Sequence, residues 1–286
     1  DPLADYIERM TEEGIDRAVL IHPEPYGDDH RLALDCVARR PDLFKTTALL
    51  YPKDENAPVR LKRLVAENPG KLVAFRFHAH EGKRHYLDAF SYANVRKLWK
   101  TAGKLGLIIE LHIGPDYAAQ AMALVREFSD FTVLVDHMAE AKFATGPDYS
   151  DVINMAKCNN VYMKLSGLNH YDADGPFYES VAPFSRWVAD AFGPDRMVWG
   201  SGSPNIVDTH LAHWSADERA RVKGGICRTS SVFRSCFPHY GAIATSIAPE
   251  PIAAAPIARF NVTDSFRMSH AMTTPKTMPS SLNGPT

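Results

Sequence analysis

Short apolar runs recur along the chain as far as Ser201, and they limit the possible fold more than any other feature. Each run is continuous in apolar residues, which is typical of strands that are covered on both faces. The first two of these runs end in proline, at Pro23 and Pro52. The seven runs comprise residues 18–23, 46–52, 72–78, 106–114, 132–137, 161–167 and 197–201.

The segments between these runs have helical periodicity, and several end in glycine or proline, as helices commonly do. Regular alternation of strands and helices predicts a parallel sheet, and we expect an α/β fold of the (β/α)8 TIM-barrel type. A doubly wound sheet is the competing architecture, but the glycine-rich phosphate turn typical of it is missing from the sequence. The predicted helices are residues 3–14, 28–40, 56–68, 92–105, 116–128, 148–158 and 177–192.

Seven runs are one fewer than such a barrel needs, and the chain opens on a helix. We therefore expect its first strand to lie upstream of Asp1. The last regular segment runs from Ser215 to Gly225, as a helix with a serine cap and a glycine stop. Beyond it the chain is rich in Ser, Thr, Pro and Ala, so we predict a barrel over residues 1–225 and an irregular, partly disordered tail over 226–286.

The overall charge argues for a small-molecule partner. The chain has 286 residues, a net charge of -2 and a pI near 6.7, so it lacks the basic field that nucleic acid or an anionic membrane would require. Four cysteines without CxxC spacing are typical of a reduced, cytoplasmic protein. We expect a small-molecule substrate, no nucleic acid and no membrane, and leave open a homo-oligomer.

Polar residues at the ends of the apolar runs mark the expected site, because barrel sites form at the carboxyl ends of the strands. Histidine dominates this set, and imidazole both shuttles protons and binds zinc. We take His112 and His137 as candidate catalytic residues. Because side chains alternate along a strand, we expect one of Asp136 and His137 to face the barrel and the other the helices, with His137 favoured for the site.

Two cations lie within strands, where an unpaired charge would be very costly. Arg76 either pairs with a carboxylate such as Glu110 or receives an anionic group of the substrate, and Lys164 has the same two roles open. His22 is a further candidate for the mouth of the site. The candidate substrate-binding residues are Arg76, His78, Lys164, Ser166 and His170. We expect six further histidines to lie in a solvated loop (His80 and His85) or at the surface and in the tail (His210, His213, His239 and His270).

With these positions in order, the chain resembles the amidohydrolase-related family of the amidohydrolase superfamily, which includes lactonases. The resemblance covers residues 3 to about 225 and rests on short motifs on successive strands. These are Gly14-Ile15-Asp16-Arg17-Ala18-Val19-Leu20, Phe75-Arg76-Phe77, Glu110-Leu111-His112, Asp136-His137-Met138, Lys164-Leu165-Ser166-Gly167 and Trp199-Gly200-Ser201-x-x-Pro204.

The resemblance implies a distorted barrel that hydrolyses a lactone or a related carboxylate-bearing compound. His112 and His137 match the family's fifth-strand and sixth-strand histidines, and an arginine like Arg76 holds a substrate carboxylate. The family's general base, an aspartate in the last-strand motif, falls on Gly202 in this chain. The family's first-strand HxH pair is missing as well. Relatives divide on metal use, so the cofactor is left unknown, with a divalent ion such as zinc as one option.

Three interpretations follow from these departures. The chain is a family hydrolase, impaired by glycine at 202 and by the absent HxH pair. Alternatively, it is a non-catalytic relative that binds a small acid through Arg76, His112 and His137. The third interpretation is an inactive fragment that serves a structural role or binds a partner.

Overall fold

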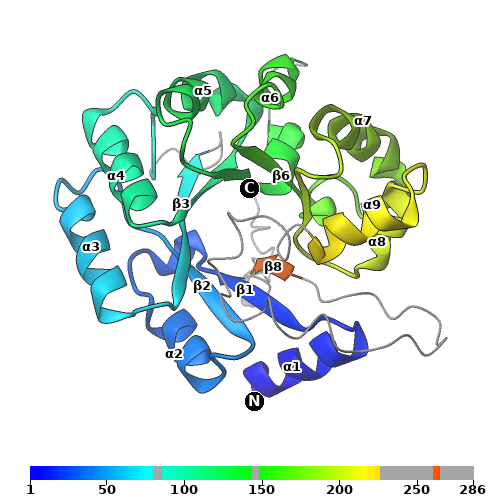
Figure 1. Cartoon of the computed structure of the whole chain (residues 1–286), viewed down its shortest axis with the longest axis horizontal. Coiled ribbons are helices and arrows are strands. Elements are labelled where there is room, and N and C mark those ends of the chain that lie inside the picture. The colour runs from blue at the N-terminus through cyan, green and yellow to red at the C-terminus, as the bar shows by residue number, and fades with distance from the viewer. Residues whose placement is uncertain (80–85, 144–147, 226–259, 265–286) are drawn as a thin grey trace, which may run out of the picture.

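A computed structural model describes residues 1–79, 86–143, 148–225 and 260–264 of this chain. Its centre is a curled, eight-stranded parallel sheet surrounded by helices (Figure 1), which confirms the predicted α/β, TIM-barrel-like fold. The strands pair in the order β7-β6-β5-β4-β3-β2-β1-β8. Their bounds are β1 Arg17–Ile21, β2 Phe44–Ala48, β3 Leu72–Ala79, β4 Ile108–Ile113, β5 Val133–Val135, β6 Val161–Leu165, β7 Met197–Trp199 and β8 Phe260–Asp264.

Each helix overlaps its predicted segment except Asn205–His210, where the sequence analysis predicts none. They pack on the outer face of the sheet, so that each strand from β1 to β7 is followed by a covering helix (Figure 1). The expected serine cap is present at Ser215, whose hydroxyl accepts from the backbone of Glu218 in a reciprocal capping box. The helices are α1 Pro2–Glu12, α2 Arg31–Arg39, α3 Ala57–Glu67, α4 Ala93–Lys104, α5 Ala118–Glu127, α6 Ser150–Met155, α7 Ala182–Phe192, α8 Asn205–His210 and α9 Ala216–Ala220.

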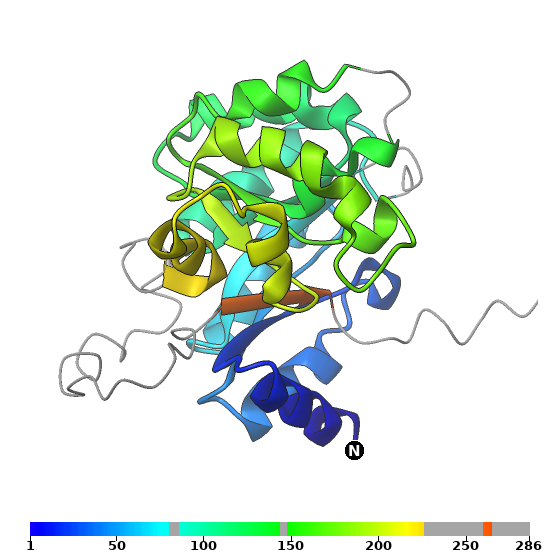
Figure 2. The ribbon, with the colours of Figure 1, turned by 90° about the vertical axis from the view of Figure 1, so that its right-hand side faces the viewer.

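One strand comes from the segment where the sequence predicts an irregular tail. Strand β8 lies beside β1, parallel to it, over the register Arg17↔Phe260 to Ile21↔Asp264 (Figure 2). It thus supplies β1 with a neighbour on the edge that is predicted to pair with a strand upstream of Asp1. The other residues of 226–286 lie outside the described part, so the domain boundary at residue 225 stays a prediction.

Alternation along each strand divides the apolar residues between two cores. Side chains such as Phe75, Phe77 and Leu111 face the helices and belong to the large outer core. A second, smaller cluster fills the inside of the curled sheet. Its buried members are Val19, Ile21, Val73, Ala74, Ile108, Leu134 and Val198.

Candidate active site

The inside of the sheet is layered, with polar residues above the small apolar cluster. Two residues beyond Ala74 and Ile108 come Arg76 and Glu110, which pair in the same register. Two residues further, His78 stands opposite His112. Because inward positions recur every second residue, each layer is one step nearer the carboxyl ends of the strands. The sequence thus builds an apolar floor, a charged layer and a histidine layer in that order.

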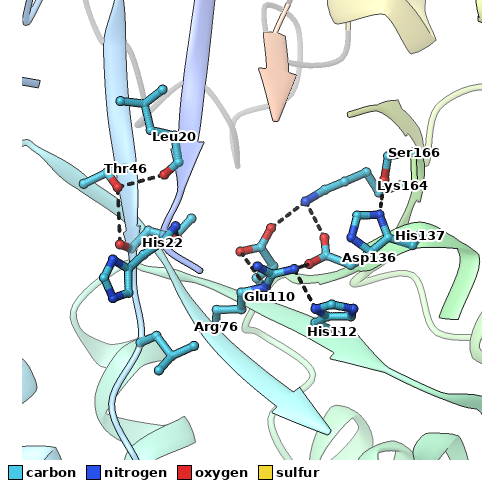
Figure 3. Close-up of polar contacts among 12 residues, drawn as sticks. Leu20, His22, Thr46, Arg76, Glu110, His112, Asp136, His137, Lys164 and Ser166 are labelled. Atoms are coloured by element: carbon cyan, nitrogen blue, oxygen red, sulfur yellow. Dashed lines mark hydrogen bonds and ion pairs between the residues drawn. The ribbon is translucent and has the colours of Figure 1, made fainter. Parts of the chain in front are cut away.

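The charged layer consists of Arg76, Glu110, Asp136 and Lys164, all at most 3% exposed (Figure 3). Arg76 Nη2 lies 2.8 Å from Asp136 Oδ2, and Lys164 Nζ lies 2.5 Å from Glu110 Oε1. Lys164 also pairs with Asp136, so it bridges both carboxylates. Each buried charge therefore has a partner of opposite sign, which its removal from water requires.

Burial and neighbouring charges shift the pKa values of Glu110 and Asp136 in opposite directions. Burial, assisted by repulsion from Asp136, raises the pKa of Glu110 to about 7. Burial also acts to raise the pKa of Asp136, but attraction to Lys164 and Arg76 outweighs it and lowers this pKa to about 2. The layer holds two cations and one permanent anion, so it gains net positive charge whenever Glu110 is protonated.

Both residues of the Asp136-His137 pair reach the site, so the expectation that one of them faces the helices is wrong. Asp136 continues the inward alternation from Leu134 and joins the charged layer. His137 then also turns inward, because the extended backbone ends at this point. His137 to Glu140 have φ values of 51°, 50°, 53° and 41°, all in the left-handed region. Strand alternation does not apply within such a turn.

Two tyrosine hydroxyls hold the left-handed turn. Tyr149 donates to the carbonyl of Met138 at 2.5 Å, and Tyr171 donates to the carbonyl of His137 at 2.7 Å. The Tyr171 oxygen also accepts from the backbone N–H of Ala141 at 3.2 Å. Non-glycine residues in this conformation cost free energy, so the surrounding contacts must fix it. The turn carries His137 at its start and Glu140 at its end.

The histidine layer gathers around His112. The His78 ring stacks on His112 with centroids 4.2 Å apart, and the His137 ring meets it edge-on at 4.9 Å. His170, from the segment after β6, lies edge-on to His137 at 5.1 Å. Ser166 Oγ lies 2.8 Å from His137 Nδ1. The structure therefore brings together all seven site residues named from the sequence.

Arg76 and Glu140 together fix the protonation of His112. Arg76 Nη2 donates to His112 Nδ1 at 2.8 Å, because a guanidinium has no acceptor atom. The proton of the neutral ring then lies on Nε2, which donates to Glu140 Oε1 at 2.7 Å. Burial, followed by the charge of Arg76, lowers the pKa of His112 to about 4. His112 is thus a neutral imidazole with both nitrogens engaged.

A metal ion was a further option for this cluster. His112, His137 and Glu140 hold donor atoms within 4.8 Å of one another, and all three are residue types that bind zinc. A metal-binding imidazole turns a lone pair to the ion and donates its other N–H to an acceptor. His112 has the reverse polarity, since its Nδ1 faces the donor Arg76 and its Nε2 carries the proton. These residues do not fit a metal ion bound through His112.

From the sequence, the orientation of Asp136 stays open and the place of Glu140 is not predicted. Counting the alternation from Leu134 would have placed Asp136 inside the barrel. No local pattern marks Glu140, because its position depends on a left-handed turn without glycine. It is nevertheless 1% exposed and accepts hydrogen bonds from two histidines.

Small residues after β7 let this segment approach the site closely. A Cβ on Gly200 would lie 2.5 Å from Lys164 Cδ, so only glycine fits beside the charged layer. Ser201 Oγ accepts from the backbone N–H of Gly167 at 3.3 Å. Gly202 follows with φ +76°, a backbone conformation that L side chains rarely adopt.

The other histidines differ in part from expectation. His210 was expected at the surface but is 0% exposed, because Ser185 Oγ and the Phe177 carbonyl bind its two nitrogens. His213 is partly exposed beside Asp190, as expected. His22 is buried at the end of β1, with Nε2 2.8 Å from the Gly27 carbonyl. His80, His85, His239 and His270 lie outside the described residues.

Comparison with known proteins gives a consistent result. A family model described as amidohydrolase matches residues 1–223. A 4-sulfomuconolactone hydrolase from Hydrogenophaga intermedia is 28% identical over 210 residues, which cover 71% of this chain and 65% of that protein. An L-fucono-1,5-lactonase from Burkholderia ambifaria is 24% identical over 238 residues, or 76% of this chain and 80% of that protein. The chain therefore spans just under two thirds of the first of these relatives.

Solved structures share the fold. A putative 2-pyrone-4,6-dicarboxylic acid hydrolase from Pseudomonas putida superimposes with a TM-score of 0.63 at 21% identity, over 82% of this chain and 88% of that one. An amidohydrolase from Burkholderia multivorans with bound zinc gives 0.63 at 19% identity, over 79% and 87%. Within the described part of the chain, no helix is both long and apolar enough to cross a membrane.

Proposed function

This chain belongs to the amidohydrolase family, and from that premise we propose that it hydrolyses the lactone ring of an acid-bearing small molecule. The observation that carries the proposal is the histidine layer directly above the buried charged layer. This arrangement offers imidazoles at the strand ends and positive charge beneath them. The names of the curated relatives, which are lactone hydrolases, support the same chemistry.

The roles of the residues follow from their places. We assign His112 and His137 to the reacting centre, with Ser166 holding the His137 ring and His78 stacked on the far side of His112. The remaining contacts to substrate in this proposal come from His170, which is the member of the layer with the most exposed side chain, at 30%.

Arg76 and Lys164 contribute mainly through their charge. Both are buried and paired with carboxylates, so direct contact with a substrate carboxylate would require them to give up a partner. When Glu110 is protonated, the layer has one uncompensated positive charge, which favours an anionic substrate above it.

The direct test is turnover of three lactones by the purified chain. We expect ring opening of 4-sulfomuconolactone or 2-pyrone-4,6-dicarboxylate to be at least about 10-fold faster than that of the neutral L-fucono-1,5-lactone, because only the first two carry acidic groups. Formation of the ring-opened acid is followed by chromatography. His112→Asn, which should abolish turnover, controls for contaminating hydrolases. A folded chain that opens none of the three contradicts the proposal.

A second function is favoured by one observation, glycine at position 202. A chain without the family's aspartate would bind a small acid and leave it unchanged. Calorimetry with 2-pyrone-4,6-dicarboxylate separates the two functions, because this alternative requires binding of the acid without any product.

A further inference from the structure

Glu140 lies at the centre of a hydrogen-bonded triad. Its Oε1 accepts from His112 Nε2 at 2.7 Å and from His170 Nδ1 at 2.8 Å. Burial by itself would raise the pKa of Glu140, but the hydrogen bonds from His112 and His170 outweigh burial and hold this pKa well below its usual range. Glu140 is therefore a carboxylate, which only accepts hydrogen bonds.

The two histidines of this triad differ in whether a ring nitrogen is still available to accept a proton. On His112 both nitrogens are engaged, Nδ1 by Arg76 and Nε2 by Glu140. On His170 the N–H is on Nδ1, because that atom donates to Glu140, so the neutral ring has its lone pair on Nε2. The His170 side chain is 30% exposed, compared with 11% for His112 and 1% for Glu140. His170 thus combines an oriented ring with access to solvent.

We propose that His170, oriented by Glu140, is the general base that activates water in this chain, a role that glycine at 202 leaves vacant. The inference rests on the proposed lactone hydrolysis. An imidazole whose Nδ1–H is held by a buried carboxylate is a common general base, because the carboxylate fixes the ring and stabilises the cation that forms.

The step balances without a further reactant. The water oxygen bonds to the lactone carbonyl carbon while one water proton moves to His170 Nε2. The tetrahedral intermediate then collapses, the bond between the carbonyl carbon and the ring oxygen breaks, and the ring oxygen takes the proton from His170 Nε2. One lactone and one water give one hydroxy acid, and His170 returns to its neutral form.

Turnover of His170→Ala tests the role in catalysis. We expect kcat to fall by about 100-fold or more with little change in KM, and added imidazole to restore part of the rate by occupying the space of the lost ring. His213→Ala is the matched control, because His213 also sits 2.8 Å from a carboxylate, Asp190, and is similarly exposed. An unchanged rate in His170→Ala, or a lost rate that imidazole does not restore, overturns the proposal.

A measurement without substrate keeps this test separate from that of the proposed function. Long-range 1H–15N spectra of the labelled chain report which nitrogen of each histidine is protonated. We expect His170 with an unprotonated Nε2, and loss of this preference in Glu140→Gln. A proton on Nε2 in the unmodified chain overturns the pair even if lactones are hydrolysed. If no lactone is opened but Nε2 is unprotonated, lactone hydrolysis fails while the oriented base stands.

Discussion

Arg76 determines where the neighbouring His112 ring carries its proton. A guanidinium only donates, so its contact at 2.8 Å determines which nitrogen of His112 carries the proton. The same nitrogen also lies 2.8 Å from Asp136 Oδ2, and the planar guanidinium places its donors in a fixed geometry that a lysine ammonium lacks. One side chain thus joins the charged layer to the histidine layer.

Gly202 can be tested by restoring the family's acid. We expect Gly202→Asp to raise the rate of lactone opening by about 10-fold or more, and to lower the free energy of unfolding by about 1 kcal/mol, since φ is +76° there. A new Cβ would meet only the flexible end of Ile206, 2.6 Å away. Gly202→Asn has the same shape and backbone cost without a base. Equal rates in the two variants would count against a catalytic gain from the carboxylate.

A substitution at Gly167 should reduce activity, because it places a methyl group against the His137 ring. A Cβ there would lie 2.5 Å from His137 Nδ1, so we expect Gly167→Ala to displace the imidazole and reduce kcat at least about 10-fold. Gly106→Ala is the control, because its φ of +74° carries the same backbone cost with nothing within 4 Å. Both variants should lose similar stability, and only the first should lose activity; equal kinetics would show that His137 tolerates displacement.

The left-handed turn from His137 to Glu140 depends on its contacts with two tyrosines. We expect Tyr171→Phe to lower the free energy of unfolding by about 1 to 2 kcal/mol, because the His137 carbonyl loses a hydrogen bond at a partly buried position. Turnover should fall more than this destabilisation explains, since the turn positions both His137 and Glu140. Urea unfolding and kcat, measured on the same sample, check the two effects. Full activity in the folded variant would show that the turn keeps its conformation without the hydrogen bond from Tyr171.

The strands could be predicted from the sequence because their outward faces and the floor of their inward face are apolar, which makes continuous runs such as Val133–Val135. Strand β8 could not, because Phe-Asn-Val-Thr-Asp is short and half polar. In the site, Arg76, His112 and Lys164 stand out as polar residues in apolar strands. Glu140 does not, because its place depends on four non-glycine residues in a conformation that tertiary contacts impose.

At the scale of the whole molecule, buried histidines link stability to pH. Burial is the main cause that lowers the pKa of His30 and of His112 to about 4 in each case, from 6.5. Their stabilisation is fully present above pH 6.5 and is lost as the pH falls toward 4, because the unfolded chain binds these protons first. Glu110 opposes them, since its stabilisation is present below pH 4.5 and is lost as the pH rises through 7.

Burial also lowers the pKa of His22 and of His210, so buried histidines outnumber Glu110 and acid should destabilise the fold. We expect the free energy of unfolding to fall by about 2 kcal/mol between about pH 7 and pH 4.5, measured by urea unfolding. His30→Gln removes one of these protons and retains an acceptor for the Leu49 N–H, so its stability should fall less between these pH values than that of the unmodified chain. A variant with the same slope as the unmodified chain would locate the effect elsewhere.

The ladder between β1 and β8 joins residues 17–21 to residues 260–264. During synthesis on the ribosome, β1 emerges early and each later strand up to β7 can pair with its predecessor as it appears. The remaining edge of β1 must wait until residues 260–264 have also been translated. For that interval the nascent protein carries an open strand edge, which is the feature that chaperones protect and that neighbouring nascent chains can capture.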